Sequence, residues 1–292
     1  MNKKLYIIFT VDWEKDHGKW KFNSKDVDYG GILTGTKCLE DILDDIGIPC
    51  TWFVETHKDY HKFDIPNLFP ESISELRSRK KDEIGTHIHW ISNNHKKNYW
   101  EYPIHDTDWV NSLIRYAKDE AESFKINPIS FRGGAFIHVP NLPLILQSNG
   151  YLIDSTFEWA PSTRIHLPKI EYISKLMSTP PLPYFSDLID IRKRGSSNIL
   201  EFPVYLWVPR ILKNKFVTSL FLQKLKYMMH GFVTFYLHID EITDHTTGPN
   251  EKTKINKSVI DSLRYFLEDL ASNENVEFLT FNAGYEYFKK IE

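Results

Sequence analysis

The stretch LYIIFTVDWE, residues 5 to 14, is an apolar run that ends in two acidic side chains. Its β-branched and aromatic residues favour a buried strand. Successive side chains of a strand point to opposite faces, so Asp12 and Glu14 share one face while Trp13 points to the other. The stretch therefore predicts a buried strand that carries two carboxylates to one place.

Strand-like and helix-like segments alternate outward from this stretch. A helical apolar spacing in TKCLEDILDDIG (36–47) leads to a strand-like PCTWFVE (49–55), and the pattern repeats through THIHW, ISFRGGAF and YLIDSTF. It continues after residue 197 with ILEFPVYLWV, GFVTFYLHID and a last strand VEFLTFN. Such alternation indicates a parallel sheet covered by helices. About seven parallel strands favour an α/β fold of the distorted (β/α) barrel type over an open doubly wound sheet.

Residues 160–197 interrupt the alternation. They are rich in proline and irregular, with STPPLPYFSD at their centre, and they are too long for an ordinary connection. We expect a functional insertion here. No linker divides the chain, so we expect residues 1–292 to form a single catalytic domain that carries this insertion.

The composition is that of an ordinary globular protein, with 41% hydrophobic and 26% charged residues. A net charge of −3 does not show the excess of positive charge that is typical of proteins binding nucleic acid or an anionic membrane. Cys38 and Cys50 are too few for a zinc motif or a disulfide framework. The apolar run before Asp12 is too short for a signal peptide, and no stretch is long enough to span a membrane. We therefore expect a cytoplasmic protein without a transmembrane segment, and the oligomeric state stays open.

A second pair of same-face side chains lies in DEIGTHIHW, residues 82 to 90. His87 and His89 are two residues apart on an expected strand, so their imidazoles converge. Further polar residues, Arg132, Asp154 and His238, follow or end other expected strands. Barrel enzymes place their sites at the carboxyl ends of their strands, so we expect these side chains to meet.

A carboxylate and two imidazoles suit a divalent metal, zinc above all, and leave a coordination position open for water. The second carboxylate would remain as a base, and such a site suits the hydrolysis of an amide or an ester. The alternative is structural: Asp12 and Glu14 cap a loop, and His89 hydrogen-bonds a carbonyl.

Seven short motifs, in this order and at about this spacing, resemble the polysaccharide deacetylase family with its NodB-homology barrel: FTVDWE, CTWFVE, DEIGTHIHW, SFRGGAF, GYLIDST, LEFPV and YLHIDE. The resemblance covers nearly the whole chain. It is greatest to the branch found in lipopolysaccharide and O-antigen biosynthesis. It implies a metal-dependent hydrolase of the carbohydrate esterase type, which removes an N-acetyl group from a sugar of a surface polysaccharide or its precursor.

The resemblance also implies roles for single residues. Asp12 matches the family's catalytic base, and Glu14 takes the place of its aspartate metal ligand. His87 matches the first histidine ligand. Arg132 stands where an arginine orients the base, a task that suits its fixed fork of donors. His238, in YLHID, matches the general acid.

Three positions depart from the family pattern. Trp13 occupies the place of the second of two adjacent aspartates, so the ligand role moves to Glu14. The family's second histidine would fall at Ile91, so His89 substitutes as the ligand. Glycines follow Arg132 where a proline and a tyrosine are usual. His238 could instead be a third imidazole ligand, and the sequence leaves both roles open.

Nearby residues invite weaker interpretations. Asp240, two residues after His238, could orient that imidazole. Asp154 could support His238 or simply end its strand. Loop histidines such as His17 and His57 are expected to be solvated rather than functional.

Two other functions compete with deacetylation of an N-acetylated sugar. A carbohydrate-binding or scaffolding protein of the same pathway would keep the barrel and lose the chemistry. A glycoside hydrolase would need Asp12 and Glu14 to flank a glycosidic bond, and two carboxylates two residues apart on one strand are poorly placed for that.

Overall fold

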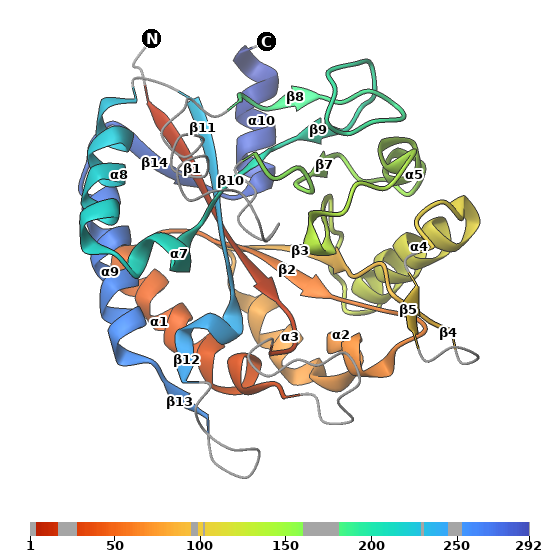
Figure 1. The fold of residues 1–292 in the computed structure, drawn as a ribbon, viewed down its shortest axis with the longest axis horizontal. Coiled ribbons are helices and arrows are strands. Elements are labelled where there is room, and N and C mark those ends of the chain that lie inside the picture. The colour runs from red at the N-terminus through yellow and green to blue at the C-terminus, as the bar shows by residue number, and fades with distance from the viewer. Residues whose placement is uncertain are drawn as a thin grey trace.

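The computed structural model describes residues 4–16, 28–94, 99–101, 103–159, 181–228, 231–244 and 253–291 (Figure 1). The strands of the main sheet are β1 (Leu5–Trp13), β2 (Thr51–Glu55), β3 (Glu83–Ile88), β6 (Ser130–Gly133), β7 (Ile153–Asp154), β8 (Tyr184–Phe185), β9 (Leu200–Glu201), β10 (Val204–Trp207), β11 (Gly231–His238) and β14 (Val276–Leu279). Two small hairpins consist of β4 (Ser92–Asn94) with β5 (Tyr99–Glu101), and of β12 (Thr243–Asp244) with β13 (Lys254–Ile255).

The α-helices are α1 (Thr36–Ile46), α2 (Ile65–Leu68), α3 (Pro70–Ser78), α4 (Thr107–Ser123), α5 (Leu142–Ser148), α7 (Val208–Leu212), α8 (Lys215–Tyr227), α9 (Lys257–Ala271) and α10 (Phe281–Ile291). Shorter helical turns are η1 (Gly31–Gly35), η2 (His61–Phe63), η3 (Gly134–Phe136) and η4 (Ile239–Ile242). Most of the expected strands and helices are present. Helix α10 differs from the sequence-based expectation, because its first two residues are the last two of the expected strand VEFLTFN.

The parallel strands close into a ring. β11, β1, β2, β3, β6 and β7 are hydrogen-bonded in this order, and every one of these pairs is parallel. Residues 200–207 complete the ring, since β9 pairs with β7 and β10 pairs with β11. The amide of Val204 donates to the carbonyl of Phe157 at 2.7 Å, and the amide of Trp159 donates to Val204 at 2.8 Å. The expected distorted barrel of about seven parallel strands is confirmed.

Proline causes one distortion of the ring. ILEFPVYLWV was expected as one strand, but it divides into β9 and β10 around Phe202 and Pro203. Proline has no amide hydrogen to donate to a ladder, so it interrupts a strand in the middle of a sheet. A second distortion is at β14, which pairs with Leu5–Ile8 of β1, whereas β2 pairs with Thr10–Trp13.

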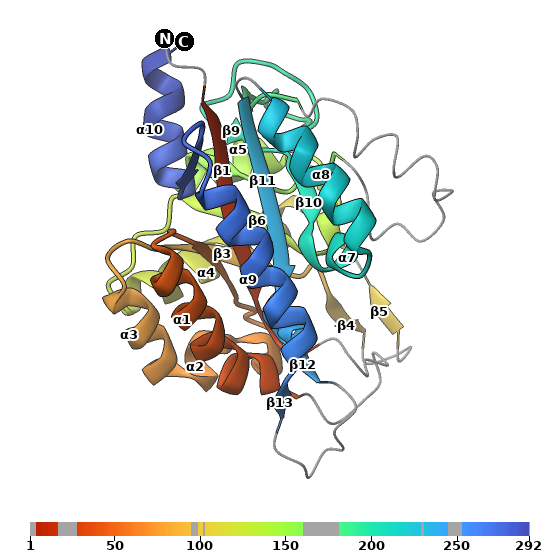
Figure 2. The same cartoon turned by 90° about the vertical axis from the view of Figure 1, so that its left-hand side faces the viewer.

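Side-chain alternation along β1 separates two apolar cores. Ile7, Phe9, Val11 and Trp13 point outward and pack in the core beneath the helices. Tyr6 and Ile8 point into the barrel, where they join a cluster with Phe281, Tyr285 and Phe288 of α10. This helix lies at the end of the barrel where both termini are drawn (Figure 2). The amino-terminal end of the barrel is therefore filled by apolar side chains.

The region expected as an insertion is described in part. Residues 160–180 lie outside the described ranges. In residues 181–197, β8 pairs antiparallel with β9 and adds an edge to the sheet. None of the described helices is long and apolar enough to cross a membrane.

Candidate metal centre

Strand register brings the predicted site residues to one level at the carboxyl end of the barrel. Asp12 of β1 is paired with His238 of β11. Glu55 of β2 is paired with His87 of β3, which is paired with Arg132 of β6. Because the strands are parallel, these residues meet at one rim, where barrel sites form.

Glu14, His87 and His89 converge on one point. The Nε2 of His89 lies 2.7 Å from the Oε2 of Glu14, and the Nε2 of His87 lies 3.7 Å from the same oxygen. The two imidazole Nε2 atoms are 3.2 Å apart. Each residue offers a ligand atom, and the three atoms lie close enough together to hold a metal ion. The structure thus assembles the set expected from the sequence.

The protonation of these imidazoles suits metal binding. Nδ1 of His87 lies 3.1 Å from the backbone carbonyl of Arg132, which can only accept, so Nδ1 carries the proton and Nε2 presents its lone pair. Burial lowers the pKa of His87, and it lowers the pKa of His89 to about 3. Both rings are therefore neutral, as ligation requires. The alternative from the sequence placed a carbonyl contact on His89, whereas the structure has it on His87.

Gly134, the second glycine after Arg132, makes room for the imidazole ring of His89. A Cβ atom at Gly134 would lie 2.7 Å from both Cγ and Nδ1 of the His89 ring. The ring therefore packs directly on the backbone of η3. The next two residues, Ala135 and Phe136, have positive φ angles of 52° and 50°. Such strained turns are held by their surroundings and occur often at functional sites.

A buried ion pair lies beside the ligands and was missed from the sequence. Lys15 Nζ lies 2.6 Å from Glu55 Oε1 and 3.7 Å from Glu14 Oε2. It also lies 3.9 Å from the centre of the Phe63 ring. The signal was present, because Glu55 ends an expected strand in the motif CTWFVE, at the same rim as the other polar residues. Lys15 gave no signal, since a lysine in a loop is ordinarily exposed.

Arg132 fixes the orientation of Asp12. It is fully buried, and its Nη1 donates to Asp12 Oδ1 at 2.6 Å and to Thr10 Oγ1 at 2.9 Å. The other guanidinium nitrogens bind Ser155: Nη2 donates to its Oγ at 3.1 Å, and Nε donates to its backbone carbonyl at 3.2 Å. Arginine often binds a carboxylate through two parallel hydrogen bonds, but here only Nη1 of Arg132 donates to Asp12.

His238 is surrounded by acidic groups. Its Nε2 lies 3.4 Å from Glu14 Oε1 and 3.8 Å from Asp12 Oδ2, and its Nδ1 lies 3.4 Å from Glu241 Oε1. Burial lowers the pKa of His238, but the carboxylates of Glu241, Glu14 and Asp12 outweigh it and raise the pKa to about 10. These acidic surroundings favour the protonated form of the ring.

A second set of ligands shares Glu14 with the first. Asp12, Glu14 and His238 also offer ligand atoms close enough together to hold a metal ion. Both expectations for His238, acid or ligand, therefore remain predictions. Asp12 and His238 are at paired positions of the neighbouring strands β1 and β11 (Figure 1), and Glu14 follows the end of β1.

Among the neighbouring residues, the surroundings of His238 and of His57 differ from expectation, whereas Asp154 has one of its two expected roles. Glu241, not Asp240, supplies the carboxylate beside His238 Nδ1. Asp154 accepts a hydrogen bond from Thr156, so its side chain serves its own strand end. His57 is buried rather than solvated, and burial lowers its pKa to about 4. His17 lies outside the described residues.

Comparison with known proteins gives similarity at the level of structure only. No protein-family model and no curated protein matches the sequence. A protein named as a polysaccharide deacetylase from Mycobacterium smegmatis aligns over 100% of this chain and 92% of its own, with a TM-score of 0.63 and 14% identity. The allantoinase PuuE aligns over 98% and 91%, with a TM-score of 0.60 and 13% identity.

A 4-α-glucanotransferase from Thermococcus litoralis also aligns, over 98% of this chain and 40% of its own, with a TM-score of 0.60 and 15% identity. At such low identity the likeness concerns the backbone, and one barrel can host different chemistries. The parallel order of the strands and the extent of the alignment agree on one conclusion. This chain has the fold of the polysaccharide deacetylases.

Proposed function

We propose that this protein is a metal-dependent hydrolase that removes an N-acetyl group from a sugar of a surface polysaccharide or its precursor. The observation that supports it most is the convergence of Glu14, His87 and His89 on one point beside Asp12. A carboxylate held by an arginine, next to three metal-type ligands and a protonated imidazole, provides the groups that amide hydrolysis needs.

Glu14, His87 and His89 would hold the ion. A neutral imidazole pair with one carboxylate is a ligand set typical of catalytic zinc. When bound, the ion would supply Lewis acidity, which polarises an amide carbonyl and lowers the pKa of water. The packing of His89 on Gly134 and the hydrogen bond from His87 to the Arg132 carbonyl hold both rings in place for this task.

Asp12 is the proposed base. Arg132 occupies its Oδ1, so Oδ2 is the oxygen that faces His238, at 3.8 Å from Nε2. A proton taken from water would be held at that oxygen. The buried guanidinium keeps the carboxylate oriented and balances its charge.

His238 is the proposed general acid. The amine expelled from an N-acetyl group is a poor leaving group until it is protonated. Nε2 of His238 faces the ligands and the base and would deliver the proton there. Glu241 lies on the opposite nitrogen and holds the ring in this orientation.

The remaining parts of the proposal repeat the expectations from the sequence. The substrate is an N-acetylated sugar of a pathway such as lipopolysaccharide biosynthesis, and residues 1–292 act as a single domain in the cytoplasm. The likeness to the Mycobacterium smegmatis protein, named as a polysaccharide deacetylase, supports the substrate class.

A glycosidase is disfavoured by the geometry of the carboxylates. Asp12 and Glu14 come from one strand, and both reach His238 Nε2, within 3.8 Å and 3.4 Å. The acid and the nucleophile of a glycosidase approach a bond from two sides. A scaffolding protein has no catalytic activity, so it would have none that depends on the metal ligands Glu14, His87 and His89.

The test combines metal content with acetate release from a panel of N-acetylated sugars. Wild-type protein should copurify with a divalent metal and release acetate without new reducing ends. His87→Ala and His89→Ala should lose both the metal and the activity while the barrel stays folded, because the rim is separate from the apolar cores. Asp12→Asn should keep the metal and lose turnover by about 10² or more.

The metal assignment is wrong if both histidine variants bind as much metal as the wild type. Release of reducing ends instead of acetate would favour the glycosidase. Bound metal with no acetate release from any sugar of the panel would favour the scaffold.

A further inference from the structure

A long segment of the chain carries positive charge alone. From Phe202 to Ile239 there is no aspartate or glutamate, whereas Arg210, Lys213, Lys215, Lys224 and Lys226 all occur. The net charge of −3 for the whole chain conceals this local excess. These five residues lie in α7, in α8 or between the two helices, which are drawn to the right of α9 in Figure 2.

Helix α8 is apolar on two opposite sides. Its inner side, with Phe221, Leu222 and Leu225, is buried in the core beneath the helices. Its outer side exposes Phe216 by 76%, Leu220 by 39% and Tyr227 by 83%. The outer three residues are four and seven positions apart, so they form one stripe along the helix, in which the exposed Gln223 lies between Leu220 and Tyr227. A helix on a soluble surface ordinarily has a polar outer side.

Lysines flank this stripe. At 3.6 residues per turn, Lys215 and Lys226 lie on one side of the stripe and Lys224 lies on the other, while Lys213 precedes the helix. Lys224 is half-buried, and its Nζ contacts the hydroxyl of Tyr205. Lys226 is paired with Asp269 of α9 at 2.9 Å. In the part of the chain that the structure describes, no carboxylate lies within ion-pair distance of Lys213 or Lys215.

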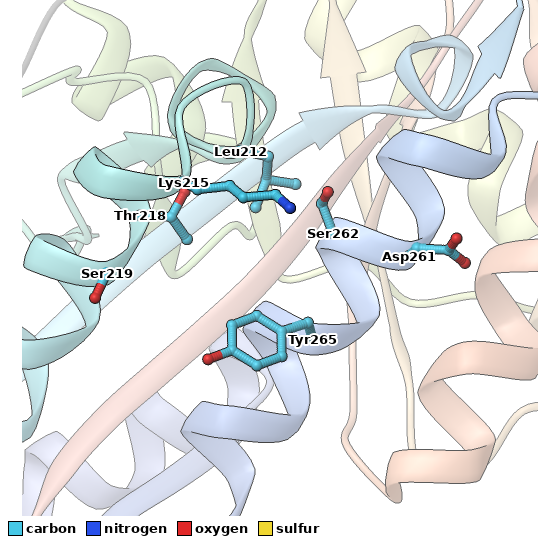
Figure 3. A pocket seen from close by; sticks show the side chains of 7 residues that line it. All are labelled: Leu212, Lys215, Thr218, Ser219, Asp261, Ser262 and Tyr265. Carbon is cyan, nitrogen blue, oxygen red and sulfur yellow. The ribbon is translucent and has the colours of Figure 1, made fainter.

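A hollow of about 420 Å³ lies beside the stripe, between α8 and α9 (Figure 3). It presents the ammonium group of Lys215 together with hydroxyl groups of α8 and α9, and the ring of Tyr265, exposed by 62%, borders it. Its lining consists of Leu212, Lys215, Thr218, Ser219, Asp261, Ser262 and Tyr265. Asp261 is its single acidic group and points away from Lys215 in Figure 3.

We propose that the outer face of α8 docks on the surface of an anionic lipid bilayer, with the helix lying in the plane of the interface. An aromatic stripe flanked by lysines is the pattern of interfacial helices: the rings enter the boundary between headgroups and acyl chains, and the ammonium groups reach the lipid phosphates. The hollow beside Lys215 has the polar groups to take one headgroup.

Two other occupants fit less well. A second copy of this face would bring lysines against lysines, which costs free energy. A protein partner would need an acidic groove shaped to a single convex helix, whereas a bilayer deforms around it. The proposal is independent of the metal centre, because α8 contributes none of the site residues.

The test is cosedimentation of the full chain with vesicles of phosphatidylcholine, with or without about a third of phosphatidylglycerol. Wild-type protein should bind the anionic vesicles and bind them less at high salt. Lys213→Glu and Lys215→Glu should each weaken binding about fivefold or more. Phe216→Ser and Tyr227→Ser should weaken it about tenfold.

Matched controls lie elsewhere on the surface. Leu144→Ser on α5, at a leucine exposed by 49%, and Lys193→Glu, at a side chain exposed by 72%, should leave vesicle binding unchanged. Acetate release from soluble substrates should not change in any of the α8 variants, which separates this proposal from the proposed function.

Equal binding to neutral and anionic vesicles would overturn the proposal, as would wild-type binding by the lysine variants. A dimer in sedimentation equilibrium that Phe216→Ser dissociates would assign the face to a second copy. Salt-sensitive binding to polyglutamate without vesicle binding would assign it to an acidic protein.

Discussion

His238 faces carboxylates on both of its ring nitrogens, and their charges bear on its role. Glu14 and Asp12 lie beside Nε2, and Glu241 lies beside Nδ1. Against the cost of burial, they raise the pKa of the ring to about 10, so it can carry a proton into the reaction. A cation bound at Glu14 would neutralise part of this field and lower the pKa toward the working range of an acid.

We therefore expect His238→Ala to keep its metal and lose turnover by about 10² or more. His238→Gln, which retains a hydrogen-bonding group but no titratable one, should behave in the same way. Metal content measured alongside acetate release checks this. Parallel loss of both in the two variants would instead identify His238 as a ligand of the second set.

The carboxyl group of Asp154 has a raised pKa because the fold buries it. Burial raises the pKa of its carboxyl to about 7, and its Oδ2 has no hydrogen-bond partner among the described residues. The neighbouring strand places Glu201 at the paired position, where burial also raises the pKa. The folded state therefore favours the protonated form of Asp154.

A raised folded-state pKa gives stability that is present below the unfolded pKa and lost as the pH rises through the folded one. Between about pH 4 and 7, the free energy of unfolding of the wild type should fall relative to Asp154→Asn, by roughly 1–4 kcal/mol. Urea unfolding of the two proteins across this range measures it. A constant difference would show that Asp154 is ionised in the folded protein.

At the scale of elements, the turn after β6 connects two parts of the site. β6 delivers Arg132 to Asp12, and η3 then passes under the ring of His89, where only a glycine fits at position 134. One short segment thus positions both the proposed base and a proposed ligand.

Gly134→Ala should displace the His89 ring, because the new methyl group would lie 2.7 Å from two of its atoms. We expect metal affinity to fall by about 10- to 100-fold with a small change in stability. Gly133→Ala is the matched control, since its methyl group would meet Thr156 and Trp90 instead. It should lower stability and retain the metal. Equal metal affinity in Gly134→Ala and the wild type would contradict the contact.

At the scale of the whole molecule, the two ends of the barrel have separate tasks. The carboxyl end gathers charged residues, and the amino end is filled by an apolar cluster that includes three residues of α10. Stability and chemistry should therefore respond to different substitutions.

Phe288→Ala, in α10, should lower the free energy of unfolding by about 3 kcal/mol, because it leaves a cavity in that cluster. Metal affinity should stay at the wild-type value. Ile291→Ala, at a side chain exposed by 45%, is the control and should cost little. Loss of metal in Phe288→Ala at temperatures where it is folded would show that the two ends are coupled.

Local sequence determined the strands, most of the helices and the face on which each predicted ligand lies. Alternation in TVDWE and THIHW is a property of any extended chain, so it placed Asp12 with Glu14 and His87 with His89 before any fold was known. The order of strands and helices likewise implied parallel pairing.

Tertiary structure decided what depends on contacts between distant segments. The position of α10 follows from its packing against side chains inside the barrel. Glu55 and Lys15 become a buried pair only when β1 and β2 lie side by side. The environment of His238 combines Asp12 and Glu14 from a distant segment with Glu241 from its own segment. Periodicity reports the direction of a side chain, whereas its partners and its charge depend on which strands become neighbours.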